Sequence, residues 1–97
     1  MNQYGEWAMR YWQENLPRQY AQIGNLERFF GEMGDHIAQE VDELTRQIAG
    51  PDQPSEGFMD KVGRLQMARI VAETEVMRQT LPQPEDEPAQ PEGAAAA

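Results

Sequence analysis

Seven large apolar residues between positions 26 and 48 constrain the fold of this chain more than any other feature. They follow one another at intervals of 4, 3, 4, 4, 3 and 4, a spacing that repeats every eleven residues. This spacing is close to the natural period of an α-helix, so the row stays on one face of a straight helix. The residues are Leu26, Phe30, Met33, Ile37, Val41, Leu44 and Ile48. We therefore expect a helix over about 25–49, with Asn25 as its N-cap and Gly50-Pro51 as its stop.

Residues 50–55 are rich in turn formers, and a second long helix is expected beyond them, over about 55–80. Asp52 or Ser55 is suited to cap it. Its apolar residues fall on two neighbouring rows, which suggests contact with two partners. One row contains Phe58, Val62, Leu65, Ala72 and Val76, and the other contains Met59, Ile70, Met77 and Leu81. Because the connector is short, the two long helices are predicted to form an antiparallel hairpin.

The first segment, about 3–16, also has a helical pattern and is rich in aromatic residues. Pro17 interrupts it and is expected to begin a short further turn that reaches Tyr20 and Ile23. The predicted fold is therefore all-α: an antiparallel helical hairpin with an aromatic-rich N-terminal helix, arranged as a three-helix bundle or as a dimeric bundle. A helical domain of 1–81 hides only about 60% of its unfolded surface, so self-association as a homodimer is expected to help it.

Residues 82–97 combine four prolines with acidic residues and end in a glycine and four alanines. Such a composition buries too little apolar surface to offset the entropy of the chain. We expect this segment to be a disordered, acidic tail. Four of the 17 acidic residues belong to it, which leaves 13 acidic against 8 basic residues in the helical domain.

The negative charge and the absence of certain features exclude several classes of function. Nucleic acid and anionic lipid both require clustered Lys and Arg, so no direct contact with nucleic acid and no membrane role are expected. The chain has no cysteine, which removes disulfides, zinc fingers and thiol chemistry. No secretion signal and no apolar run of about 18 residues is present, so a cytoplasmic protein is expected.

Two groups of residues are candidates for an interaction surface. The aromatic side chains of the first segment either complete the core as a third helix or take part in recognition, where Trp and Tyr are enriched. Arg69 and Glu73 lie one turn apart inside the apolar arc of the last helix. They form either an ion pair at the edge of the core or polar contacts within an oligomer interface. The candidate interface residues are Tyr4, Trp7, Tyr11, Trp12, Met59, Arg69, Ile70, Glu73 and Met77.

Small residues form a further row beside the main apolar row of the 25–49 helix: Gly31, Gly34, Ala38, Thr45 and Ala49. Glycine inside a helix costs about 1 kcal/mol relative to alanine, so a compensating reason is expected. Small side chains allow another backbone to approach closely or allow a bulky ring, such as a tryptophan, to settle in a groove. The row is therefore interpreted as structural.

No catalytic, cofactor or metal site is expected. His36, the single histidine, lies one turn from both Glu32 and Glu40. Bundle metal sites use Glu-x-x-His, however, and position 33 is Met, so a solvated face is favoured.

The sequence thus favours a small, non-enzymatic helical protein that binds another protein and associates with itself. Small accessory, assembly or regulatory proteins of phages and mobile elements are often built in this way, by analogy. The alternative is an acidic, antitoxin-like inhibitor that competes with nucleic acid for a basic protein surface.

Overall fold

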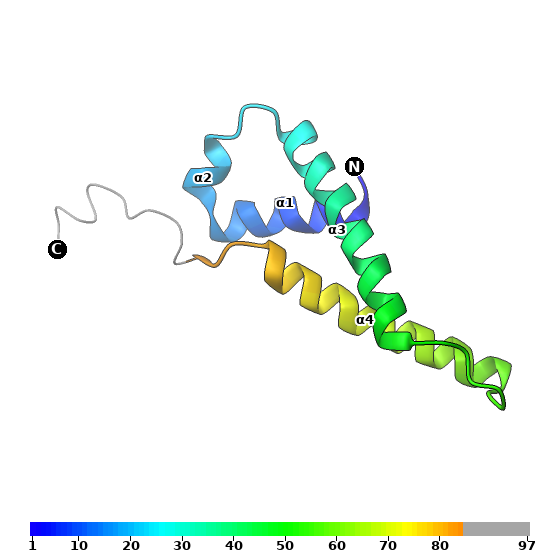
Figure 1. Ribbon diagram of the computed structural model, residues 1–97. Coiled ribbons are helices and arrows are strands. Elements are labelled where there is room, and N and C mark those ends of the chain that lie inside the picture. Colours follow the sequence, from blue (N-terminus) through cyan, green and yellow to red (C-terminus); the bar gives the residue numbers. More distant parts are fainter. Residues whose placement is uncertain (85–97) are drawn as a thin grey trace.

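The computed structural model describes residues 1–84, and all regular structure in that range is helical (Figure 1). The all-α prediction is therefore confirmed. The predicted tail lies outside the described residues from residue 85 onward. No helix within residues 1–84 combines the length and the apolar character that crossing a membrane requires. The helices are α1 (Gln3–Asn15), α2 (Pro17–Ala21), α3 (Leu26–Ala49) and α4 (Phe58–Thr80).

Helix α3 begins and ends where the sequence predicts. The side chain of Asn25 accepts a hydrogen bond of 3.0 Å from the backbone N–H of Arg28, as an N-cap does. At the other end Gly50 has a φ of 67°, which a glycine adopts without steric cost, and its N–H donates to the carbonyl of Arg46. The apolar row is buried at Phe30, Ile37 and Val41, so it faces the core through the middle of the helix.

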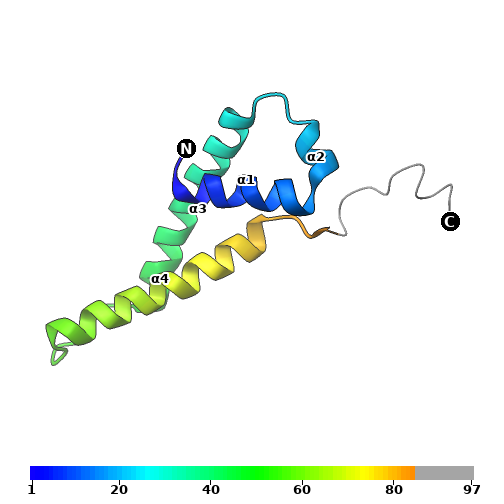
Figure 2. The same cartoon turned by 180° about the vertical axis from the view of Figure 1, so that it is seen from behind.

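Helix α4 runs back along the second half of α3 in the opposite direction, so the two helices form the predicted hairpin (Figures 1 and 2). It begins at Phe58, three residues later than expected, and Gly57 occupies the N-cap position without a side-chain hydrogen bond. The prediction that Asp52 or Ser55 caps this helix is wrong. Asp52 and Ser55 lie five and two positions before the N-cap, too early to cap a helix that starts at Phe58, and the carboxylate of Asp52 lies 2.6 Å from the ammonium of Lys61 instead.

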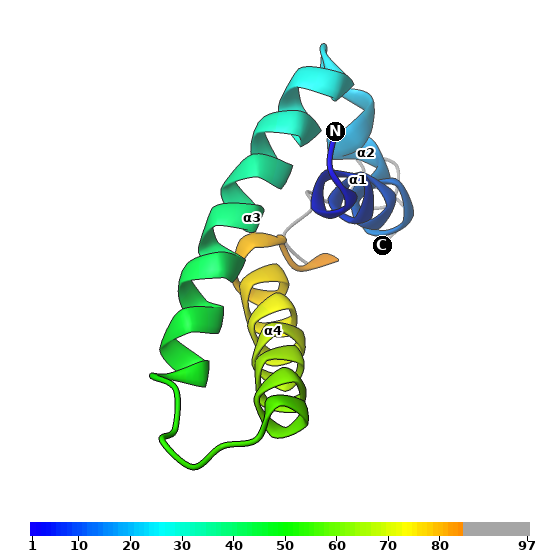
Figure 3. The ribbon, with the colours of Figure 1, turned by 90° about the vertical axis from the view of Figure 1, so that its right-hand side faces the viewer.

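Helix α1 packs against the first half of α3. Asn2 caps its start by accepting a hydrogen bond from the N–H of Gly5, and Pro17 is the first residue of α2, as predicted. Viewed along α1 in Figure 3, α3 stands upright, so the two helices cross rather than run in parallel. The side of α1 that faces the core is a row of residues four apart: Tyr4, Ala8, Trp12 and Leu16.

Two glycines allow the close crossing of α1 and α3. A Cβ added to Gly34 would lie 2.7 Å from the backbone nitrogen of Gly5 and 2.9 Å from its Cα. A Cβ on Gly5 would in turn lie 2.6 Å from the carbonyl oxygen of Phe30. Gly34 therefore makes room for the backbone of α1, which is the first of the two reasons suggested by the row of small residues. Trp12 packs instead edge-on against the rings of Phe29 and Phe30.

Helix α3 is thus the element that the other two long helices share. Helix α1 covers its first half and α4 lies beside its second half (Figure 3). Because α1 ends its contact with α3 near the middle, the far end of the α3–α4 hairpin consists of two helices without a third from residues 1–84. An amphipathic helix pair needs a further layer to cover its apolar side. Apolar side chains at this end of the hairpin therefore remain exposed.

Candidate interaction surface

The uncovered end of the hairpin carries two adjoining grooves between α3 and α4. The first has a volume of about 370 Å³ and is lined by Leu44, Ile48, Ile70, Val71, Thr74 and Glu75. The second, of about 340 Å³, is lined by Ile48, Ala49, Arg64, Met67, Ala68 and Val71. Ile48 and Val71 line both, so the grooves form one continuous surface. We refer to its apolar residues, Leu44, Ile48, Met67, Ile70 and Val71, as the hairpin face.

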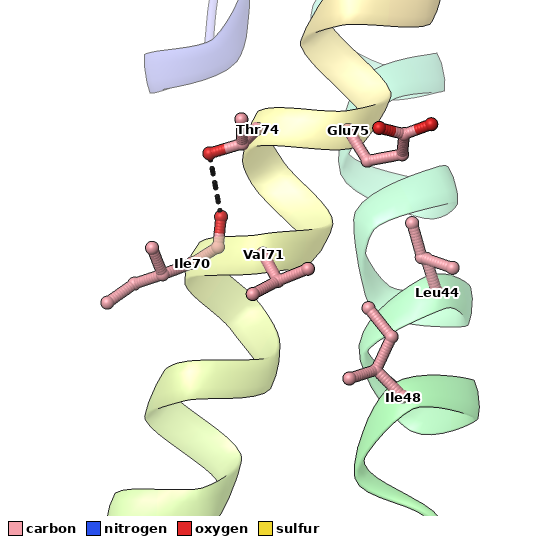
Figure 4. A pocket seen from close by; sticks show the side chains of 6 residues that line it. All are labelled: Leu44, Ile48, Ile70, Val71, Thr74 and Glu75. Carbon is pink, nitrogen blue, oxygen red and sulfur yellow. Dashed lines mark hydrogen bonds between the residues drawn. The ribbon is translucent and has the colours of Figure 1, made fainter.

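The large side chains of the hairpin face are unusually exposed for apolar groups. The exposed fractions are 44% for Ile48, 61% for Met67, 56% for Ile70 and 49% for Val71. Figure 4 shows Leu44 and Ile48 of α3 across from Val71 of α4, whereas Ile70 points away from α3. Single exposed apolar residues are common, whereas contiguous sets of them are typical of interaction sites.

The seam between the two helices explains why these side chains remain exposed. The residues of α4 that are buried against α3 in this region are alanines, Ala68 and Ala72. Small side chains at a helix contact bring the axes close together and fill little volume. The larger Val71 and Met67 therefore lie at the edge of the seam, where one side of each faces solvent. The apolar surface left over is a consequence of the local sequence of α4.

Three of the candidate residues from the sequence meet at the junction of α1 with α4. The hydroxyl of Tyr4 donates to Glu73 over 2.7 Å, and the guanidinium of Arg69 donates to the same hydroxyl over 3.0 Å. Arg69 also lies 3.8 Å from Glu73 and 3.4 Å from the carboxylate of Asp42 on α3. These polar groups connect all three long helices. Within residues 1–84 their partners are thus in the same chain, as the ion-pair interpretation expects.

Burial, together with the hydrogen bond to Glu73, raises the pKa of Tyr4 above its usual 10.0. We expect Tyr4→Phe to lower the free energy of unfolding by about 1 kcal/mol at neutral pH, because one net hydrogen bond is lost. A raised pKa means that the stability contributed by this hydroxyl is present below pH 10 and is lost as the pH rises. The difference between the two proteins should therefore shrink above pH 10, as measured by urea denaturation across this range. A difference that stays constant with pH would contradict the buried hydroxyl.

The other candidates from the N-terminal helix differ in exposure. Trp12 is buried, whereas Trp7 is 40% exposed and packs edge-on against the ring of Tyr4 at 5.4 Å. Tyr11 is half-buried and donates a hydrogen bond of 2.6 Å to the carbonyl of Pro82, just beyond the end of α4. Met77 is half-buried against the core. An interaction role rests on Trp7, since Trp12 is buried and Tyr11 of α1 and Met77 of α4 are half-buried.

The last two candidates are exposed on α4, and Ile70 is part of the hairpin face. Met59 is 74% exposed, close to the beginning of the helix. Sequence reasoning missed the rest of the face, because Ile48 was assigned to the core row and Met67 and Val71 were assigned to no row. Met67 and Val71 lie one helical turn apart, with Ile70 between them. The width of that apolar arc was the signal that could have identified them.

The elbow that joins α3 to α4 is fixed by a group of charged residues. Arg64 makes two hydrogen bonds to Glu56, of 2.8 and 2.9 Å, and a third to the carbonyl of Ala49 at the end of α3. The hydrogen bond from Arg64 lowers the pKa of Glu56, and the one from Lys61 lowers the pKa of Asp52. Both pKa values are lowered by ion pairs that hold the connector in place. Structural ion pairs perturb pKa values just as catalytic sites do, so these shifts need no catalytic role.

Much of the negative charge on α3 and α4 lies beside arginine. Glu32 is 3.2 Å from Arg28, Glu43 is 2.5 Å from Arg46, and Glu75 is 2.6 Å from Arg78. Pairing with arginine reduces the anionic character at these three positions, whereas Glu27, Asp35 and Glu40 of α3 are exposed and form no ion pair within residues 1–84. Among residues 1–84, no group of three or more His, Cys, Asp or Glu side chains is placed to hold a metal ion.

We compared the chain with protein-family models, with curated proteins and with solved structures, and none of them matches it. The proposed function therefore rests on the physical properties of the hairpin face.

Proposed function

We propose that this protein is a small, non-enzymatic helical interaction protein that associates with itself through the hairpin face. A second copy of the chain is the partner that covers this face. The single observation that carries the proposal is the contiguous exposure of Ile48, Met67, Ile70 and Val71 at the end of the hairpin that α1 does not reach. As an accessory, assembly or regulatory protein, it would act by presenting the assembled helices to other proteins.

The area of the surface that contains the hairpin face supports a second copy of the chain as the partner. From Met59 to Arg78, α4 is about 30 Å long and about 10 Å wide, and the second half of α3 beside it adds a strip of about 18 Å by 10 Å. The projected area is then on the order of 500 Å², the same order as the roughly 800 Å² that each partner contributes to a stable dimer. A two-fold dimer would place two helix pairs together as a four-helix bundle, which supplies the missing layer.

The proposal is tested by placing a charge in the centre of the hairpin face with Val71→Asp. The wild type is expected to elute and scatter light as a dimer, with twice the 11.1 kDa mass of one chain. A two-fold interface contains Val71 of both copies, so one substitution changes two buried side chains. Burial of each valine side chain contributes about 1.5 kcal/mol or more to the free energy of association. The dimer dissociation constant should therefore rise at least about a hundredfold, as measured by sedimentation equilibrium.

Gln39→Asp is the matched control, because it places the same charge on an exposed position of α3 that is not part of the hairpin face. This variant should remain dimeric, and both variants should retain the helical circular dichroism of the wild type. A wild type that stays monomeric up to millimolar concentration would overturn the proposal. So would dissociation caused equally by both variants.

The arrangement of charge favours this function over the acidic inhibitor that competes with nucleic acid. An inhibitor of that class needs a continuous anionic surface to imitate a phosphate backbone. The acidic residues at Glu32, Glu43 and Glu75 each lie beside an arginine. The side chains that line the two grooves at the end of the hairpin are mostly apolar, and apolar contact is what a helical partner supplies.

A further inference from the structure

Two oppositely charged residues of α4 lie on the same side of the helix as the hairpin face, one at each end. Asp60 and Arg78 are 18 positions apart, which corresponds to five full helical turns and a separation of about 27 Å. Met67 and Val71 lie between them, each within about 20° of the line that joins the two charges. The order along this line is therefore acidic, apolar, apolar, basic.

This line has a symmetry that suits a two-fold axis. Position 69 is midway between Asp60 and Arg78, and it is also midway between Met67 and Val71. A two-fold axis perpendicular to α4 at this level exchanges the members of each pair. Met67 of one copy then meets Val71 of the other, and Asp60 of one copy meets Arg78 of the other at both ends of the contact.

We propose that two copies of this chain pack with their α4 helices antiparallel, in a register set by two Asp60–Arg78 ion pairs that flank a Met67–Val71 centre. This inference rests on the proposed self-association and specifies its geometry. Within residues 1–84, Asp60 is exposed and its carboxylate makes no hydrogen bond or ion pair in its own chain. The guanidinium of Arg78 lies 2.6 Å from the carboxylate of Glu75, yet its side chain is 64% exposed. It can therefore form an ion pair with a second carboxylate. In a parallel arrangement, by contrast, each residue would face its own copy and the like charges would repel.

Thiol cross-linking tests the antiparallel arrangement directly, because the chain contains no cysteine of its own. We expect a short bis-maleimide to join Asp60→Cys to Arg78→Cys when the two variants are mixed as full-length proteins. Each variant alone should give little product, since the two introduced thiols would be about 27 Å apart across the axis. Strong cross-linking of Asp60→Cys with itself would overturn the antiparallel register. Electrophoresis and mass spectrometry distinguish these products.

Charge reversal tests the ion pairs separately from the orientation. An exposed pair changes an affinity by up to about fivefold, and each variant converts two attractive pairs into two repulsive ones. Asp60→Arg and Arg78→Asp are therefore each expected to weaken the dimer about tenfold or more at low salt. The double variant should regain most of the wild-type affinity, because the pairs form again with their signs exchanged. A double variant as weak as the single variants would overturn the proposed pairing.

The outcomes separate this inference from the proposed function. If Val71→Asp dissociates the dimer while the two charge reversals leave its affinity unchanged, self-association through the hairpin face stands and the register is wrong. If the wild type is a monomer under all conditions, both proposals are overturned. The helical circular dichroism of each variant shows that its fold is intact, since positions 60 and 78 are both exposed.

Discussion

Phe30→Ala is expected to remove most of the stability of the domain. Phe30 is fully buried where α1, α2 and α3 meet, and its ring contacts Trp12, Tyr20 and Phe29. Truncation of a buried phenylalanine costs about 3–5 kcal/mol, whereas a domain of this size is stabilised by roughly 4–12 kcal/mol in total. The midpoint of thermal unfolding should fall by at least about 15 °C. Thermal denaturation followed by circular dichroism, at a fixed protein concentration, measures the change.

Phe29→Ala is the natural control, because the adjacent residue has the same side chain and is 37% exposed. Its ring packs against Trp12 from outside the core, so the loss of stability should be clearly smaller than at Phe30. Equal losses at the two positions would mean that the buried aromatic cluster does not lie where the structure places it.

The second large effect is expected at Gly34, where α1 and α3 cross. Gly34→Ala adds a Cβ within 2.9 Å of the Gly5 backbone, and backbone atoms cannot move aside as the end of a flexible side chain can. Overpacking of this kind costs about 1–3 kcal/mol. Gly34→Leu should cost more and separate α1 from α3. Urea denaturation of both variants, together with the near-ultraviolet dichroism of the aromatic side chains, reports the change.

Gly31→Ala is a control for which we expect the opposite change, a gain in the free energy of unfolding. A Cβ at Gly31 meets nothing within 4 Å, so this variant should gain up to about 1 kcal/mol from the better helix propensity of alanine. The two glycines lie one turn apart in the same helix, and a simple propensity effect would stabilise both variants. Stabilisation by Gly34→Ala would therefore refute the close crossing.

The core of this protein is concentrated at one end, and this arrangement connects its stability with its proposed function. The aromatic cluster around Phe30 and the crossing at Gly34 stabilise the half of α3 that α1 covers. The other half is held by an alanine seam and by the ion pairs of Arg64 at the elbow. We expect a second copy to supply there the apolar burial that the chain lacks, so that stability and assembly are coupled through mass action.

Local sequence patterns predicted the helices well. The eleven-residue spacing of the row from Leu26 to Ile48, with Asn25 before it and Gly50 after it, predicted both ends of α3. These signals depend on backbone hydrogen bonds and on residues only a few positions apart, so they can be read without a tertiary structure. The start of α4 was predicted less well, because its N-cap is Gly57, which has no side chain to signal a helix start.

The surface could not be predicted in the same way. A helical projection shows which residues share a side of a helix, but it does not show which part of that side a neighbouring helix covers. Ile48 continues the row of Val41 and Leu44 in sequence, yet Val41 is buried and Ile48 is exposed. Likewise, Tyr4, Trp7 and Trp12 were equally good candidates for recognition, and their exposure differs because the buried row of α1 passes through positions 4, 8, 12 and 16.

The sequence by itself therefore determined that the chain forms amphipathic helices, where the longest of them begins and ends, and that its two long helices fold back on each other. Only the tertiary structure decided that α1 crosses α3 at Gly34 and leaves the far end of the hairpin uncovered. The physical reason is that helix formation follows from contacts within a few residues, whereas the burial of a side chain depends on the place where distant segments meet.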